Sequence, residues 1–397
     1  MSKKIVLFYD DQLPVGSANA TRIVSFAHIF RKAGYDVVML GINYNDSPRP
    51  NGLYEEIPYQ LLSFPEMHCT GVKSFKRRRH LKINLKKWLN DYKERKGLDF
   101  VFYSSRNGLA SFFVNFSKET NIPVIYNHVE WHLLSMFSGK FGVFSFIQNR
   151  YELHFVLRRI KNIVAISSLL QEYYDKQGCH TIRIPTIINL ANYPDERVFP
   201  SNSKLILAYA GKPGKKDAIL NVVKAINLLG EDKNKIEFRI YGINEEQLKK
   251  MGYLNEEDKL LIGKQVYCMG RIPYDQVQKE LRKADFTILL RKNWRNANAG
   301  FPTKVGESMA AGVPVIANLT SDIGLYLHDE VEGLVCANES PEACAVALQR
   351  ALKLSVVQKK KMRISARRQA EKGFNYETYV VDVNKYLCRV SDEKREK

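Results

Sequence analysis

Short apolar runs alternate with amphipathic stretches along the first half of the chain. Ile5–Tyr9 is a continuous apolar run, as expected for a buried parallel strand. Apolar residues then recur at helical spacing in 20–32, Gly34 can end that helix, and 36–40 is apolar again. This order predicts a strand–helix–strand unit. Further strands are predicted within 98–105, within 122–130 and at the start of 160–178.

The same alternation begins again near residue 204, after irregular, proline-containing sequence that we interpret as a linker at 186–203. Strands are predicted at 204–211, 236–242, 264–270, 284–290 and 333–338, with helices near 217–229 and 274–284 and long helices at the end of the chain. Two successive doubly wound α/β units fit this pattern. We predict a first domain over 1–190 and a second over 203–375, with a final helix at 376–397 able to fold back on the first domain.

Charge and cysteine usage narrow the class of protein. The formal net charge of +19 predicts anionic partners, such as nucleic acid, an acidic membrane face or phosphorylated small molecules. The six cysteines lack paired spacing, which favours reduced thiols over disulfides or a zinc site. The first residues do not follow the signal-peptide pattern. We therefore expect a cytoplasmic protein.

The segment 72–96 is strongly basic, and its apolar residues recur at helical spacing. It combines Lys73, Lys76, Arg77, Arg78, Arg79, Lys82, Lys86 and Lys87 with Leu81, Leu85, Trp88 and Leu89. Two interpretations of this amphipathic helix remain open. It can lie on an anionic membrane surface, or its leucines can pack on the first domain while its charges face water.

Several loops of the second unit follow predicted strands directly, and in a doubly wound sheet ligands bind at such strand ends. One carries Gly211, Lys212 and Lys216, where glycine allows close backbone approach and lysine attracts phosphate. The loops that begin at Gly242 and at Gly270-Arg271 occupy equivalent positions. Each of these turns is also compatible with a purely structural role.

The stretch 299–318, AGFPTKVGESMAAGVPVIAN, gives the most specific signal. Pro302 suits the first helical position, and Gly312 can end the helix before a buried strand. Helix N–H groups and Lys304 favour an anion at the amino end. Glu307 lies about one turn further and can accept hydrogen bonds from two sugar hydroxyls. A phosphate site beside a diol site describes a nucleoside diphosphate.

This segment resembles the E-x7-E motif of the retaining glycosyltransferases of family 4, the group 1 transferases. Glu307 stands in the place of the second glutamate, which holds the ribose in that family, and Ala299 replaces the first glutamate. The resemblance implies a GT-B fold, in which two Rossmann-like domains face a central cleft. It implies transfer of a hexose-type sugar, with retention of configuration, from a UDP- or GDP-linked donor to a glycan or lipid-linked acceptor. If segment 72–96 binds a membrane, a lipid-linked acceptor and a role in cell-envelope or surface polysaccharide synthesis are expected. No metal and no cofactor besides the donor are expected.

The same resemblance assigns site residues. Donor-binding residues would be Gly16, Ser17, Gly211, Lys212, Lys216, Gly242, Arg271, Gly300, Phe301, Thr303, Lys304 and Glu307. His128, Glu130 and Lys216 would be catalytic, with Lys216 on the leaving diphosphate. The expected partners are the nucleotide sugar, the acceptor and an anionic membrane surface contacted through 72–96, at the inner face of the membrane.

Four alternative assignments fit the sequence less well. A nucleotide-sugar 2-epimerase shares the layout, although Ala299 offers it no carboxylate. A nucleic-acid-binding protein would use the charge, but no recognised motif is present. A dehydrogenase would need a G-x-G-x-x-G after a predicted strand, which is absent. His128 and His132 have the spacing of paired metal ligands, yet Glu130 does not follow in the zinc-protease order.

Overall fold

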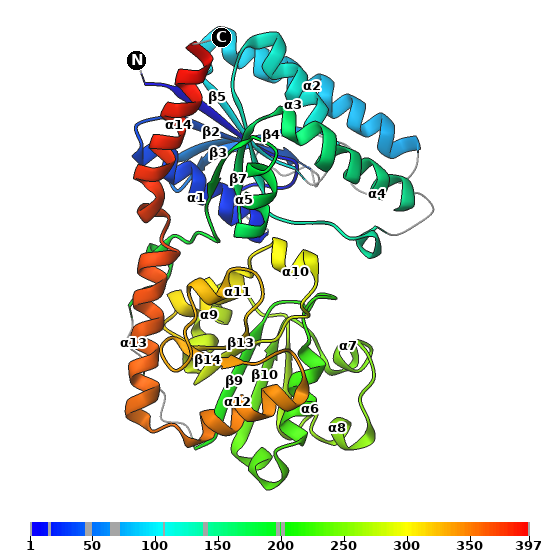
Figure 1. Ribbon diagram of the computed structural model, residues 1–397, viewed down its shortest axis with the longest axis vertical. Helices are drawn as coiled ribbons and strands as arrows, with labels where there is room; N and C mark the ends of the chain where they lie inside the picture. Colours follow the sequence, from blue (N-terminus) through cyan, green and yellow to red (C-terminus); the bar gives the residue numbers. More distant parts are fainter. Residues whose placement is uncertain are drawn as a thin grey trace. The chain divides into compact units, whose positions relative to one another are not determined.

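The computed structural model of the chain describes residues 2–14, 17–43, 50–63, 72–105, 108–137, 142–195, 199 and 203–395. The chain divides into two compact units, shown in Figure 1. Unit 1 comprises Met1–Ile187 and Tyr376–Lys397, and unit 2 comprises Ile188–Asn375. The boundary between them falls inside the predicted linker 186–203.

Unit 1 is built on an eight-stranded sheet with the order β3-β4-β2-β1-β5-β6-β7-β8. Its strands are β1 (Lys4–Tyr9), β2 (Asp36–Asn43), β3 (Asn51–Tyr54), β4 (Ile57–Ser63), β5 (Phe100–Ser104), β6 (Val124–His128), β7 (Asn162–Ala165) and β8 (His180–Arg183). All neighbours are parallel except β3 and β4, which form an antiparallel hairpin. The strand order changes direction between β1 and β5, so a topological switch point lies at the carboxyl ends of these two strands.

The helices of unit 1 are α1 (Ala18–Lys32), α2 (Val72–Lys96), α3 (Ala110–Thr120), α4 (Gly142–Tyr151), α5 (Ser168–Asp175) and α14 (Val380–Arg395). Ser17 caps α1, since its hydroxyl accepts a hydrogen bond from the Ala20 N–H at 3.1 Å. One face of α1 packs on the sheet through residues such as Ile23 and Phe26, and α14 packs along α1 through Leu387. The C-terminal helix therefore belongs to the core of unit 1, as Figure 1 shows.

A buried arginine of α1 holds the end of unit 1 in place. The guanidinium of Arg22 donates to the Asn127 side chain at 3.1 Å and to the carbonyls of Ile184 and Pro185. Burial lowers the pKa of Arg22 to about 9. These bonds fix the last residues of unit 1 before the chain enters unit 2.

Unit 2 has a six-stranded parallel sheet with the order β11-β10-β9-β12-β13-β14. Its strands are β9 (Leu205–Ala210), β10 (Ile236–Tyr241), β11 (Val266–Gly270), β12 (Phe286–Leu289), β13 (Val315–Asn318) and β14 (Gly333–Cys336). Counted along the chain, this is the Rossmann order 3-2-1-4-5-6, with a switch point between β9 and β12. The prediction of two doubly wound α/β units is confirmed.

The helices of unit 2 are α6 (Ile219–Asn227), α7 (Glu245–Lys249), α8 (Glu256–Leu260), α9 (Tyr274–Lys283), α10 (Arg295–Ala299), α11 (Thr303–Ala310), α12 (Pro341–Lys353) and α13 (Val356–Gly373). The start of α11 differs by one residue from the predicted start. Pro302 is the residue before α11 and not its first helical residue, because its backbone is extended at ψ 111°. Gly312 follows the end of α11 with a φ of +68°, which suits the glycine that was predicted to end this helix.

Candidate functional site

The loops after β9 and β12 meet at the switch point of unit 2. Asp217 and Arg291 form an antiparallel backbone bridge, and the Lys292 N–H donates to the Lys216 carbonyl at 2.9 Å. The Ala218 N–H donates to the Leu290 carbonyl at 2.8 Å. The lysine-rich loop that follows β9 is therefore held against the basic loop that leads into α10 and α11.

Two glycines that were predicted to bind the donor contact each other. Gly211 and Gly242 both have left-handed backbones, with φ values of +112° and +118°. A Cβ atom on Gly242 would lie 2.7 Å from the carbonyl carbon of Gly211 and 2.8 Å from its oxygen. A Cβ atom on Gly211 would lie 3.1 Å from Cε of Lys304. Glycine is thus needed at both positions because a backbone and a lysine approach them closely.

Asp217 organises the loop after β9. Its carboxylate accepts hydrogen bonds from the Tyr209 hydroxyl at 3.0 Å and the Gly214 N–H at 2.9 Å, and it lies 3.5 Å from Nε of Arg291. The side chains of Asp217 and Arg291 are both nearly inaccessible to water. The helix α6 begins at Ile219, two residues after Asp217, without a side-chain cap. The buried ion pair holds the Asp217 carboxylate within the loop.

Sequence reasoning missed the residue that fixes Arg291. The side chain of Asn318, at the end of β13, accepts from the Arg291 N–H and donates to the Arg291 carbonyl, both at 2.8 Å. This pair of bonds sets the start of the loop after β12. An asparagine at the end of a buried strand was the available sequence signal, but its partner is remote along the chain.

Lys304 and Glu307 lie on neighbouring turns of α11 and are both half-buried. Nζ of Lys304 lies 5.1 Å from the centre of the Tyr209 ring, in cation–π geometry. Burial lowers the pKa of Lys304, although Asp217 and Glu307 oppose this shift. Burial likewise raises the pKa of Glu307, and Lys304 partly offsets the increase. A half-buried cation and a half-buried carboxylate thus stand together at the first turns of the helix.

The other residues that were predicted to bind the donor differ in their exposure to solvent. Gly300 is buried and Thr303 is half-buried at the start of α11. The Phe301 ring packs in an aromatic cluster, 5.5 Å from the Tyr326 ring centre and 5.6 Å from that of Phe374. Its side chain is therefore part of the core, and only its backbone remains for a ligand. Lys212 and Arg271 are exposed in their loops.

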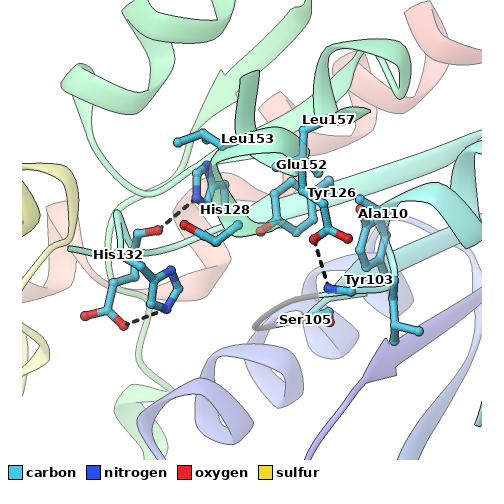
Figure 2. A pocket seen from close by; sticks show the side chains of 13 residues that line it. Tyr103, Ser105, Ala110, Tyr126, His128, His132, Glu152, Leu153 and Leu157 are labelled. Carbon is cyan, nitrogen blue, oxygen red and sulfur yellow. Dashed lines mark hydrogen bonds and ion pairs between the residues drawn. The ribbon is translucent and has the colours of Figure 1, made fainter. Parts of the chain in front are cut away.

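A pocket in unit 1 lies at the carboxyl ends of β5 and β6, as Figure 2 shows. It contains both residues predicted to be catalytic in this unit, His128 and Glu130, together with Tyr103, Tyr126 and Glu152. Among the described residues the Tyr103 hydroxyl, although buried, has no hydrogen-bond partner. The pocket therefore offers a hydroxyl that a bound polar ligand can pair with.

Both ring nitrogens of His128 are engaged. Its Nε2 lies 2.9 Å from the Glu130 carbonyl, which can only accept, so Nε2 carries the proton. Its Nδ1 then accepts from the Tyr174 hydroxyl at 3.0 Å. Burial, with a smaller contribution from His132, lowers the pKa of His128 to about 3. The imidazole is thus neutral near pH 7 and acts as a hydrogen-bond donor at Nε2.

Of the other predicted residues of unit 1, Glu130 lines this pocket. The Glu130 carboxylate is half-buried and lies 3.8 Å from Nε2 of His132. The Ser17 hydroxyl, which caps α1, is also 3.4 Å from the Tyr9 hydroxyl. Gly16 lies outside the described residues. In the described ranges no three His, Cys, Asp or Glu side chains gather as a metal site would require.

Glu152 is a pocket residue that no sequence pattern indicated. It begins η2 (Glu152–Val156), a single π-helical turn that continues α4. Its carboxylate accepts from the Gly108 N–H at 2.8 Å, and burial raises its pKa. Such π-helical turns are frequent at functional sites. The turn aims Glu152 and Leu153 into the pocket (Figure 2).

Known proteins resemble this chain in sequence over part of its length and in fold over nearly all of it. Residues 194–372 match the family model described as glycosyl transferases group 1. No curated protein matches the chain. Three solved structures are similar over nearly all of both chains: a sucrose-phosphate synthase of Thermosynechococcus elongatus, a glycosyltransferase of Rickettsia africae and the Anabaena protein HepE in complex with UDP.

The three structures have similar sequence identities and TM-scores to this chain. The synthase is 16% identical, with a TM-score of 0.72 over 98% of this chain and 100% of its own. The Rickettsia enzyme is 15% identical, with a TM-score of 0.70 over 100% of both chains. HepE is 14% identical, with a TM-score of 0.66 over 98% of this chain and 100% of its own. Residues 194–372 therefore match the group 1 glycosyltransferases, and the two parallel-sheet domains match the GT-B fold of these solved structures.

Proposed function

We propose that the protein transfers a hexose-type sugar from a nucleoside diphosphate sugar, which unit 2 binds, to a glycan or lipid-linked acceptor. The observation that carries this proposal is the convergence of Gly211, Lys216, Lys304 and Glu307 at the switch point of the Rossmann sheet. Ligands of doubly wound sheets bind at such points. The UDP and UDP-glucose found with HepE support UDP as the nucleotide, with GDP as the competing choice.

The charged residues of unit 2 are proposed to have distinct roles in binding the donor. A diphosphate leaving group gains negative charge as the glycosidic bond breaks. Lys216, Lys304 and the first N–H groups of α11 supply fixed positive charge at that point, so the charge can be stabilised without a metal. Glu307 accepts hydrogen bonds from the two ribose hydroxyls, as the family resemblance implies. Lys212 and Arg271 extend this electropositive region from their exposed positions.

Unit 1 is proposed to bind the sugar and the acceptor. His128 is neutral, and its Nε2–H can turn from the Glu130 carbonyl to a sugar hydroxyl. We therefore assign His128 a hydrogen-bonding role and not that of a general base. The neighbouring Glu130 carboxylate is proposed to orient the acceptor. Retention of configuration is proposed by resemblance, with attack on the face that the leaving group vacates and with the departing phosphate accepting the acceptor's proton.

We further propose that the reaction serves cell-envelope or surface polysaccharide synthesis in the cytoplasm, at the inner membrane face. The high positive charge supports this location, since anionic lipid attracts basic surfaces. In the structure Leu81, Leu85 and Leu89 of α2 are buried in unit 1. The helix therefore cannot insert these leucines into lipid, and segment 72–96 contributes only its charged outer face.

A thermal-shift panel of UDP-, GDP- and ADP-sugars tests the proposal. One nucleotide class is expected to raise the melting temperature, because a ligand that binds only the folded state stabilises it. Lys216→Ala and Glu307→Gln should each lose that shift. Lys264→Ala and Glu342→Gln, which change exposed residues of the same types in unit 2, should keep it. The assignment fails if no nucleotide sugar shifts the wild-type protein or if both site variants respond like their controls.

A further inference from the structure

One helical surface of unit 1 exposes apolar side chains in a continuous row. Along α4 and η2, five large apolar residues on one face are between 50% and 68% exposed. We call this row the α4 stripe; its members are Val143, Phe144, Ile147, Tyr151 and Phe155. Single exposed apolar residues are ordinary on a soluble protein, whereas a row at helical spacing indicates an interaction surface.

The opposite face of the same helical segment lines the pocket. Asn149, Glu152, Leu153 and Leu157 are pocket residues, and Figure 2 shows the last three on the pocket side. The segment thus contacts the catalytic pocket on one face and presents apolar side chains to the surroundings on the other. Packing within unit 1 explains the residues on the pocket side of this segment. It does not explain why the other side carries exposed apolar residues.

Basic residues border the α4 stripe. On α2, Nη1 of Arg78 donates to the Gln148 side chain of α4 at 3.0 Å, so the two helices are joined at this point (Figure 1). Arg79 and Lys87 of α2 are exposed. At the other end, Arg158 lies 5.5 Å from the centre of the Phe155 ring, and Arg159 is exposed.

Acidic residues are missing from both stretches of sequence. Residues 72–89 contain no Asp or Glu, and Glu152 is the single acid in 142–162. Glu152 is buried and its pKa is raised by that burial, so it adds little negative charge at the surface. Glu119 of α3 pairs with Lys86 of α2 at 2.6 Å. Apart from this pair, the two stretches place an apolar row beside cations and add no exposed acid of their own. This arrangement complements a surface that has an apolar interior beneath anionic groups. Anionic phospholipid has this arrangement.

We propose that the α4 stripe docks unit 1 onto an anionic membrane, with its apolar side chains at the acyl boundary and the basic residues of α2 and 157–159 on the headgroups. Docking through this surface does not depend on the proposed sugar transfer. Its consequence does: the helical segment that contacts lipid also lines the pocket, so the acceptor would be a molecule held in that membrane. No helix of the described residues has the length and apolar character to cross a bilayer, and the docking needs none.

Co-sedimentation with vesicles tests the apolar part of this proposal. The full chain should bind vesicles of phosphatidylglycerol and phosphatidylcholine and should bind phosphatidylcholine alone at least tenfold more weakly. Phe144→Ser/Ile147→Ser should weaken binding to the anionic vesicles at least tenfold. The matched control is Val356→Ser/Val357→Ser, which removes two exposed apolar residues from α13 and should stay within twofold of wild type.

A second pair of variants tests the electrostatic part. Arg79→Glu/Lys87→Glu should weaken binding at least tenfold. Lys204→Glu/Lys264→Glu makes the same change of net charge on exposed residues of unit 2 and should have little effect. Far-ultraviolet circular dichroism should show that every variant is folded.

Three results would overturn the proposal. These are no binding of the wild-type chain to anionic vesicles, equal binding by the α4 stripe variant, or an equal loss in the controls. Sedimentation velocity tests whether a second copy of the chain, instead of lipid, binds the α4 stripe. A dimer that Phe144→Ser/Ile147→Ser converts to monomer would show that the stripe joins two copies. Because nucleotide binding by unit 2 is measured separately, a failure here is distinguishable from a failure of the proposed function.

Discussion

Replacing Gly242 by alanine should disturb the nucleotide site through the backbone contact between two loops. The new Cβ atom would lie 2.7 Å from the carbonyl carbon of Gly211, and neither backbone can yield easily. The φ of +118° adds strain of roughly 1–3 kcal/mol. Overpacking of this kind costs roughly 1–3 kcal/mol more. We therefore expect the free energy of unfolding of unit 2 to fall by about 2–6 kcal/mol.

The control is Gly230→Ala, where φ is +59° and the added Cβ would meet no described residue within 4 Å apart from its neighbours along the chain. Left-handed strain alone costs about 1–2 kcal/mol there. Amide hydrogen exchange in β9 and β10 measures the stability of unit 2 apart from that of unit 1. Calorimetry with UDP should show a loss of affinity of about tenfold or more for Gly242→Ala, because the displaced loop carries Lys216. Equal exchange rates and equal UDP affinities in the two variants would refute the reasoning.

Three further predictions concern charged or titrating groups. Asp217→Asn breaks a buried ion pair with Arg291 and should destabilise unit 2 by about 3–5 kcal/mol, measured by hydrogen exchange; a change below about 1 kcal/mol would contradict the assigned role. Because the pKa of Glu307 is raised, its carboxylate is lost on acidification earlier than an ordinary glutamate, so UDP affinity should fall as the pH decreases. Glu307→Gln should weaken binding at every pH, and the residual affinity, measured at high UDP concentration, should lack that dependence; a variant with the wild-type pH profile would count against a ribose contact. Burial lowers the pKa of His128 to about 3, so its imidazole stays neutral in the folded state at pH values where it is protonated in the unfolded chain. The stability that His128 contributes is therefore complete above about pH 6.5. It declines as the pH falls towards 3, by about 1.4 kcal/mol per pH unit. Denaturation of wild type and His128→Gln at several pH values should show this slope only in the wild type.

The fold followed from the sequence because buried parallel strands leave continuous apolar runs. Ile5–Tyr9 and the run at 204–211 are such strands, and the structure places β1 and β9 there. The hairpin β3–β4 was missed for the opposite reason. Its residues are largely exposed or half-buried, so 51–63 shows neither a continuous apolar run nor a clean alternation.

The candidate site was predictable where chemistry sits next to a strand end or a helix start. Gly211, Gly242 and Glu307 belong to this class, because each lies in a loop or helix whose position follows from the sheet. The Asp217–Arg291 pair does not, since it joins loops that only the sheet order brings together. The roles of these residues in binding stay predictions.

The α4 stripe illustrates a second limit of sequence patterns. Apolar residues at helical spacing normally indicate the buried face of a helix. In 142–155 they face outwards, while polar Asn149 and Glu152 face the pocket. The pattern of this segment alone does not tell which of its faces the protein covers. In 72–96 the usual rule holds, and Leu85 is fully buried.

The central claim is that the switch point of unit 2 binds a nucleoside diphosphate. A crystal structure of the chain with UDP tests it most directly. We predict the diphosphate within hydrogen-bonding distance of Nζ of Lys216 and of the first N–H groups of α11, with both ribose hydroxyls on the Glu307 carboxylate. Nucleotide bound elsewhere on the chain, or the absence of bound UDP, GDP and ADP under saturating conditions, would contradict the claim.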